Sequence, residues 1–132
     1  MEFELNGKRY STQKLDTRAQ FHLLRKLGAA LPVIEPLVNP DNVDQDPTIL
    51  VTMLMTQLDD AAADYVMNAA LWAVSRYQDT GWVKVMRNGQ NLFSDIELAD
   101  LLSIVAKVIT ENLGSFFHTA LTNLGRAETP EI

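Results

Sequence analysis

The last third of the chain carries a long hydrophobic stripe. Over residues 94–124 apolar side chains recur at steps of three and four, at Leu98, Leu102, Val105, Ile109, Leu113, Phe116, Ala120 and Leu124. This spacing places them on one face of a helix, with Asp100 and Glu111 on the opposite, polar side. We therefore expect a long amphipathic helix whose apolar face is covered by the rest of the chain or by another protein.

Two further sequence features concern the start and the interior of this predicted helix. Ser94 followed by Glu97 fits a capping box, in which each side chain accepts a hydrogen bond from a backbone N–H at the helix start. Gly114 has low helix propensity and predicts a kink or a break in the second half.

At the other end, residues 2–11 alternate in polarity around Asn6-Gly7, which predicts an N-terminal β-hairpin. A tight turn there places Phe3 opposite Tyr10 and Glu4 opposite Arg9. Asn88-Gly89 predicts a second hairpin turn. The two hairpins either combine into one small sheet or stand alone.

Three further helices are predicted between these hairpins, at residues 16–31, 49–58 and 61–77. Residues 32–47 hold four of the five prolines and read as a proline- and aspartate-rich connector. Residues 126–132 form a polar tail. The predicted fold is mainly α: one domain over residues 1–132, a compact bundle of about four to five helices with one or two short β-hairpins.

Composition narrows the class of protein. The chain has 132 residues and no cysteine, and we find no signal peptide and no transmembrane stretch. Its net charge of −6 opposes binding to nucleic acid. The first 31 residues nevertheless carry six basic and three acidic side chains, against five basic and fourteen acidic in the rest. We interpret this asymmetry first as internal docking, and second as a partner surface.

The sequence shows no catalytic motif, and we expect neither enzyme activity nor a cofactor. The aspartates around Asp41 resemble a calcium loop, but Asp46 stands where that loop needs glycine and Thr52 where it needs a bidentate glutamate. We therefore expect no metal site. The carboxylates of Asp60 and Asp64 share a helix face, and we interpret them as helix-start charges.

Two groups of residues are candidates for partner binding. Arg18, His22 and Arg25 share one flank of the first helix, and form either a solvated face or a surface for an acidic partner. The second group is Leu113, Phe116 and Phe117, which serve either self-association and client binding or the core of the monomer.

Three stretches together resemble the tail assembly chaperones of long-tailed bacteriophages. They are FELNGKRYSTQKLDTRAQFHLLRKLGAALP, YVMNAALWAVSRY leading into WVKVMRNGQNLFSDIEL, and LLSIVAKVITENLGSFFHTAL, which span nearly the whole chain in order. The chain resembles the short form of this family, which often also has a longer form made by ribosomal frameshifting.

The resemblance implies a protein that coats the tape measure protein, keeps it soluble and helps recruit the tail tube subunit. It also implies self-association into a homo-oligomer, action in the cytoplasm of the infected host cell, and absence from the mature virion. No catalytic residues are carried over from the family. The alternative function is a structural head–tail connector or another tail component of the virion.

Overall fold

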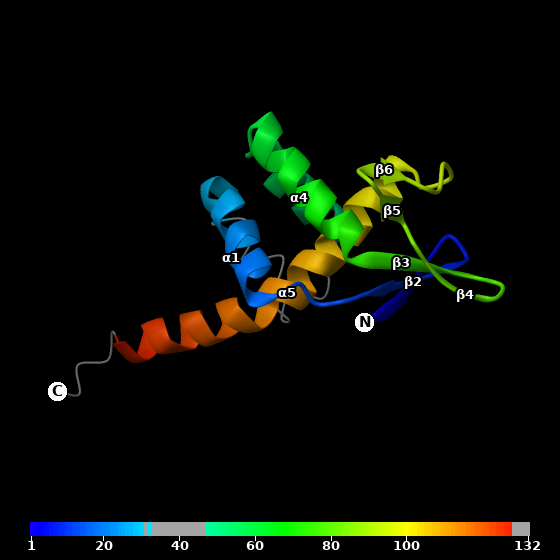
Figure 1. Ribbon diagram of the computed structural model, residues 1–132. Helices are drawn as coiled ribbons and strands as arrows, with labels where there is room; N and C mark the ends of the chain where they lie inside the picture. The colour runs from blue at the N-terminus through cyan, green and yellow to red at the C-terminus, as the bar shows by residue number, and fades with distance from the viewer. Residues whose placement is uncertain (31, 33–46, 128–132) are drawn as a thin grey trace.

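The computed structural model describes residues 1–30, 32 and 47–127 (Figure 1). Within these residues the elements, in chain order, are β1 (Glu2–Leu5), β2 (Lys8–Thr12), α1 (Thr17–Lys26), the 3-10 turn η1 (Gly28–Ala30), α3 (Pro47–Thr56), α4 (Asp60–Trp72), β3 (Val74–Gln78), β4 (Gly81–Lys84), β5 (Met86–Arg87), β6 (Gln90–Asn91) and α5 (Leu98–Ala127). The connector predicted at 32–47 and the polar tail predicted at 126–132 lie mostly outside the described residues.

The fold is mixed α/β, so the predicted mainly α bundle with one or two hairpins is wrong. In the described residues four α-helices pack with a four-stranded antiparallel sheet of order β1-β2-β3-β4, and β5 and β6 form a separate two-stranded sheet. Figure 1 shows α1 and α4 on the same side of α5, with the larger sheet near the first half of α5.

The error arises at the end of α4, where residues 61–77 were expected to be one helix. The helix ends at Trp72, and residues 74–78 form β3 in the middle of the sheet. The sequence VSRYQ alternates: Val74 and Arg76 are buried, whereas Tyr77 is exposed. This period of two suits a strand, and β3 gains backbone hydrogen bonds to both β2 and β4.

Both predicted hairpin turns are present. Asn6 and Gly7 have φ of 51° and 76°, and Asn88 and Gly89 have φ of 55° and 76°, which are the left-handed values that a tight two-residue turn needs. Glu4 pairs with Arg9 as expected. Phe3 and Tyr10 stack with ring centroids 5.6 Å apart.

The core is built around the first half of α5. The side chains of Ile104, Val105, Val108, Ile109 and Leu113 are all buried there, which places the middle of the predicted stripe in the core. Two other members of the stripe, Leu98 and Phe116, are exposed. They join buried residues of α1, α3, α4 and the sheet in one hydrophobic cluster. α5 runs unbroken through Gly114, so of the two alternatives predicted there, a kink or a break, the break is absent.

The start of α5 differs from the predicted capping box at Ser94 and Glu97. The helix begins at Leu98, and the backbone N–H of Glu97 donates to Asp100 Oδ2 at 3.1 Å. Asp100 thus supplies the cap from the first turn. It was expected on the wet side but is only 8% exposed, and it accepts a further hydrogen bond of 2.7 Å from Asn6 Nδ2.

Polar contacts attach the N-terminal hairpin along α5. In addition to the bond between Asn6 and Asp100, the Thr12 hydroxyl donates to the Glu111 carboxylate. The Met1 amine lies 3.3 Å from Glu111 Oε1. Residues expected on the solvated side of α5 therefore hold the sheet, because the hairpin covers this side of the helix.

Candidate functional site

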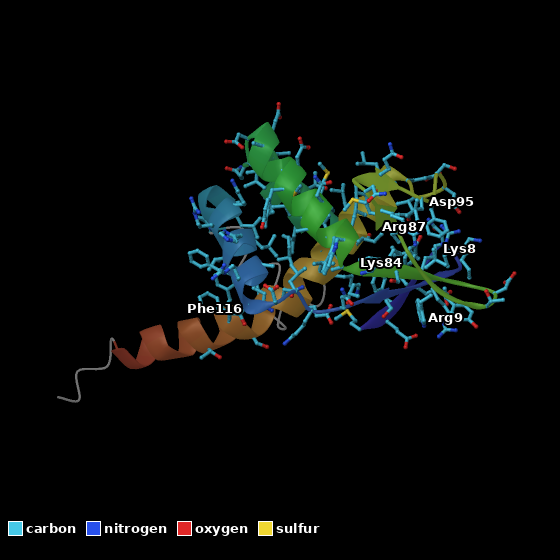
Figure 2. The ribbon with its side chains drawn as sticks, in the orientation of Figure 1. Lys8, Arg9, Lys84, Arg87, Asp95 and Phe116 are labelled. Carbon is cyan, nitrogen blue, oxygen red and sulfur yellow. The ribbon has the colours of Figure 1, made fainter. Side chains whose placement is uncertain are left out.

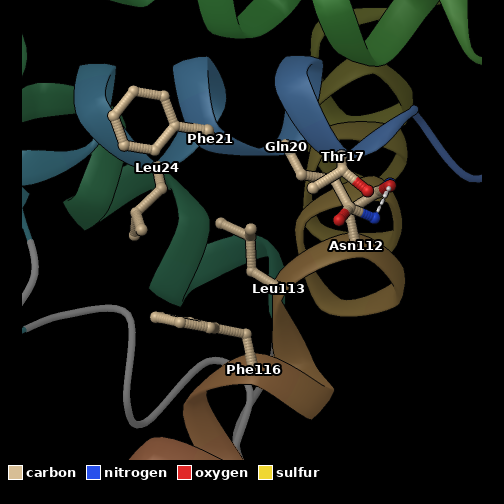
Figure 3. A pocket seen from close by; sticks show the side chains of 7 residues that line it. All are labelled: Thr17, Gln20, Phe21, Leu24, Asn112, Leu113 and Phe116. Carbon is tan, nitrogen blue, oxygen red and sulfur yellow. Dashed lines mark hydrogen bonds between the residues drawn. The ribbon is translucent and has the colours of Figure 1, made fainter.

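An apolar pocket lies between α1 and α5 (Figure 3). Its volume is about 190 Å³, and its lining residues are Thr17, Gln20, Phe21, Leu24, Asn112, Leu113 and Phe116. Leu113 is buried at 2% exposure, whereas Phe21 and Phe116 are 56% and 51% exposed. We call this feature the α1–α5 pocket.

Local sequence signals place α1 against α5. Asp16 caps the helix by accepting a hydrogen bond of 2.8 Å from the backbone N–H of Ala19. Leu23 and Leu27 are buried in the core. Two residues of helix turn by about 200°, so Phe21 lies nearly opposite the buried Leu23, and its ring remains half exposed.

Asn112 fixes the polar end of the pocket. Its Oδ1 accepts hydrogen bonds from the backbone N–H of Leu15 at 2.8 Å and from Gln20 Nε2 at 3.2 Å. Its Nδ2 donates to the Val108 carbonyl at 2.9 Å. Because Asn112 is only 6% exposed, these bonds tie the start of α1 to α5 in the interior.

The two phenylalanines that follow Gly114 have different environments. Phe117 is partly buried and packs against the core. Phe116 is half exposed at the mouth of the pocket, with its ring centroid 5.3 Å from that of Phe117 in an edge-to-face contact. The two alternatives left open for the pair therefore divide between them: Phe117 belongs to the core and Phe116 to the surface.

The three basic candidates lie beside the pocket on α1 and do not line it. Arg18 and Arg25 are exposed and His22 is partly exposed. The His22 ring contacts Phe21 edge-on at 5.7 Å. Among the described residues, none of the three forms an ion pair, so internal docking of this flank is not seen there.

Among the residues that the structure describes, the ionisable groups with shifted pKa values lie at or beside the sheet and not at the pocket. The guanidinium of Arg76 donates two hydrogen bonds to Asp95, of 2.7 and 2.9 Å, which lower the pKa of Asp95 and raise that of Arg76. Burial raises the pKa of the Tyr10 phenol. This geometry ties the loop before α5 to the sheet, and offers no acid–base pair inside a pocket.

Within the described residues, no group of three or more histidine, aspartate or glutamate side chains is arranged to hold a metal ion. No described helix has the length and apolar content that a bilayer span requires. The calcium-like aspartates at Asp41, Asp44 and Asp46 lie outside the described residues.

Sequence reasoning named the α5 side of the pocket and missed the α1 side. Leu113 and Phe116 were candidates, whereas Phe21 was not. The sequence did contain a signal for the α1 side. Steps of three, one and three residues place four side chains on one face of α1, beside its leucine face: Thr17, Gln20, Phe21 and Leu24. This face is hard to recognise in the sequence because basic residues stand between its members.

The family comparison covers nearly the whole chain. The model of the family described as "Phage tail assembly chaperone protein, TAC" matches residues 6–125. Comparisons with curated proteins and with solved structures gave no match. The chain belongs to the phage tail assembly chaperone family.

Proposed function

We propose that this tail assembly chaperone binds the tape measure protein, keeps it soluble and helps recruit tail tube subunits, through protein–protein contacts without catalysis. The proposal is supported by membership of the family and by the α1–α5 pocket, whose half-exposed phenylalanines face solvent beside a buried leucine. It includes self-association into a homo-oligomer, action in the cytoplasm of the infected host cell and absence from the mature virion.

The size and lining of the pocket favour a protein client. Pockets for drug-sized ligands have volumes of roughly 300–1,000 Å³. The α1–α5 pocket, at about 190 Å³, is smaller and mostly apolar. It suits one or two apolar side chains projecting from a helix, in the helix-in-groove mode of recognition. The family resemblance implies a long, helical tape measure protein, which would offer such anchors along its length.

The exposed aromatic rings supply a free-energy gain for this contact. Fully burying a phenylalanine side chain contributes about 1.5–3 kcal/mol. Phe21 and Phe116 are about half exposed, so each would contribute a fraction of that amount on binding. Arg18, His22 and Arg25 would then form a polar rim beside the contact, where charge selects among partners more than it adds affinity.

The test is co-expression with the tape measure protein encoded by the same phage, scored by solubility and co-purification. Phe116→Asp places a charge at the mouth of the pocket, and we expect it to abolish co-purification. Ser115→Asp is the matched control, because it adds the same charge one residue earlier on the exposed surface of α5. Phe117→Asp is a poorer probe, since Phe117 packs against the core.

Circular dichroism of both variants separates loss of binding from loss of folding. If folded Phe116→Asp still keeps the tape measure protein soluble, the pocket is not the client site. A second measurement separates the chaperone from a permanent head–tail connector or tail component: purified virions should lack this protein. Its presence there in stoichiometric amounts would favour the structural alternative.

A further inference from the structure

The outer face of the larger sheet carries a second set of exposed side chains. Strand register aligns Glu4, Arg9, Tyr77 and Trp82 in one row across β1, β2, β3 and β4. A neighbouring row contains Glu2, Ser11, Ser75 and Lys84. The alternate residues Tyr10, Val74 and Arg76 face the core and are buried. The outer face therefore consists of the residues that alternate along each strand with the core-facing residues.

Two cations on this face stack on aromatic rings. The guanidinium carbon of Arg9 lies 4.8 Å from the ring centroid of Tyr77 and 5.6 Å from that of Trp82. Lys84 Nζ lies 4.6 Å from the ring centroid of Trp72, at the end of α4. Tyr77 and Trp82 also contact each other edge-to-face at 5.4 Å.

These five residues, Trp72, Tyr77, Trp82, Arg9 and Lys84, form what we call the aromatic–cation patch. The three aromatic side chains are 51%, 40% and 41% exposed, in that order, although each is large and apolar. Tyrosine, tryptophan and arginine are the residues most enriched in the energetic centres of protein interfaces. Because the rings and cations already contact one another, little side-chain entropy remains to be lost when a partner binds.

The charges around the patch indicate the chemistry of its partner. Arg9 and Lys84 lie on this face at the sheet end of the molecule (Figure 2), and Glu2 and Glu4 lie beside them at β1, in a chain whose net charge is −6. Arg9 has one carboxylate partner, Glu2 at 3.0 Å, and both side chains are more than half exposed. Such an exposed pair is weak and is readily exchanged for another carboxylate. Lys84 Nζ contacts the Trp72 carbonyl at 3.0 Å.

We propose that the aromatic–cation patch is a second docking surface, separate from the α1–α5 pocket, and that it binds an extended protein segment whose sheet-facing side chains, every second one along the segment, are acidic and apolar in turn. The carboxylates would pair with Lys84 and Arg9, while the apolar side chains cover the tryptophan and tyrosine rings. The acidic and the apolar residues must stand two positions apart, because an extended segment across β2–β4 presents every second side chain to the sheet.

Aromatic rings beside cations on a sheet also suit single-stranded nucleic acid. Two observations favour a protein instead. Glu2 and Glu4 lie on the same face, at β1, where they would repel phosphates, and the net charge of −6 opposes approach to a polyanion. A protein segment avoids the first penalty by placing basic or neutral residues opposite β1, and the second is smaller for it because it carries fewer negative charges than a polyanion.

Intrinsic fluorescence provides the test, because Trp72 and Trp82 are the two tryptophans of the chain and both lie in the patch. The probe is a synthetic peptide that repeats glutamate, serine, valine and serine, so that glutamate and valine face the same side of an extended chain. It is compared with the same peptide carrying lysine in place of glutamate. A single-stranded oligodeoxynucleotide tests the nucleic-acid alternative. We expect a saturable change in tryptophan emission with the glutamate peptide, weakened by added salt, and none with the other two probes.

Lys84→Glu should weaken peptide binding about tenfold or more, because it replaces the attractive charge with a repulsive one. Lys14→Glu is the matched control: it makes the same charge change at an exposed residue outside the patch and should leave affinity within about twofold. Arg9→Gln gives a second, milder variant, and circular dichroism verifies folding. Equal binding of the glutamate and lysine peptides, preference for the oligonucleotide, or unchanged affinity in folded Lys84→Glu would overturn the proposal.

Discussion

The α1–α5 pocket and the aromatic–cation patch are two surfaces of opposite character at opposite ends of one core. Figure 2 shows Phe116 at the helical end and Lys8, Arg9, Lys84 and Arg87 at the sheet end. The pocket is lined mainly by apolar side chains, whereas the patch combines rings with cations. Binding at the pocket should thus depend weakly on salt, and binding at the patch strongly, because exposed charges are screened over about 8–10 Å.

Helix α5 connects the pocket end of the molecule to the sheet end. Its first half is covered by α3, α4 and the sheet, and polar side chains on it hold the hairpin through Asn6 and Thr12. At Asn112 the same helix begins to hold α1. A single rigid helix therefore sets the separation between the two surfaces.

The largest effect on stability is expected from a substitution at the buried base of the α1–α5 pocket. Leu113→Ala removes a side chain that is 2% exposed, and should lower the free energy of unfolding by about 2–5 kcal/mol, since the loss of burial is added to a cavity. Leu98→Ala on the same helix is the control: Leu98 is 71% exposed, so the change should stay within about 0.5 kcal/mol. Urea unfolding followed by circular dichroism measures both. Equal losses would mean that Leu113 is not part of the core.

A smaller effect is expected from the polar end of the pocket. Asn112→Ala leaves the buried N–H of Leu15 without its acceptor, which should cost about 1–3 kcal/mol of unfolding free energy. Asn68→Ala replaces an exposed asparagine of α4 and should be neutral or slightly stabilising, because alanine is the better helix former. The same urea titration compares them, and a neutral Asn112→Ala would show that this bond does not fix α1.

The sequence predicted one of these two regions better than the other. Around the pocket, the leucine and phenylalanine spacing of α5 gave the correct face, because helical periodicity is a local property. It could not show that Phe21 of α1 completes the pocket, since that depends on how two helices far apart in sequence meet. Family membership was inferred from the order of three long stretches and is confirmed.

The sheet was predicted poorly for a related reason. Both turns and the register of the first hairpin follow from Asn-Gly and alternation, and are confirmed. The sequence pattern predicts a helix over residues 61–77, which includes most of the strand at 74–78, because small residues precede this strand without a glycine or proline between them. Its pairing with β2, more than sixty residues earlier, depends on tertiary contacts, which a local sequence pattern does not encode. The patch depends on β3, and so it could not be found from sequence.

The smallest expected effect concerns the sheet end and its response to pH. Arg76 holds Asp95 in a bidentate pair, and this hydrogen bonding lowers the pKa of Asp95 below its ordinary value of 3.8. A lowered folded-state pKa means that the pair contributes stability above the unfolded-state pKa and loses it as pH falls through the folded-state pKa. Asp95→Asn should therefore be less stable than the wild type at neutral pH, and the difference should shrink below about pH 4.

Thermal unfolding of both proteins between neutral pH and about pH 2 measures this convergence. Asp79→Asn is the control for net charge, because it removes the same charge from an exposed residue that forms no ion pair among the described residues. Asp95 is itself largely exposed, so the effect should be small and should diminish further in high salt. A difference that stays constant down to the lowest pH would show that Asp95 acts through its shape and hydrogen bonds, and not through its charge. In that case the loop before α5 would be fixed to the sheet independently of pH, as α1 is fixed to α5 by the uncharged Asn112.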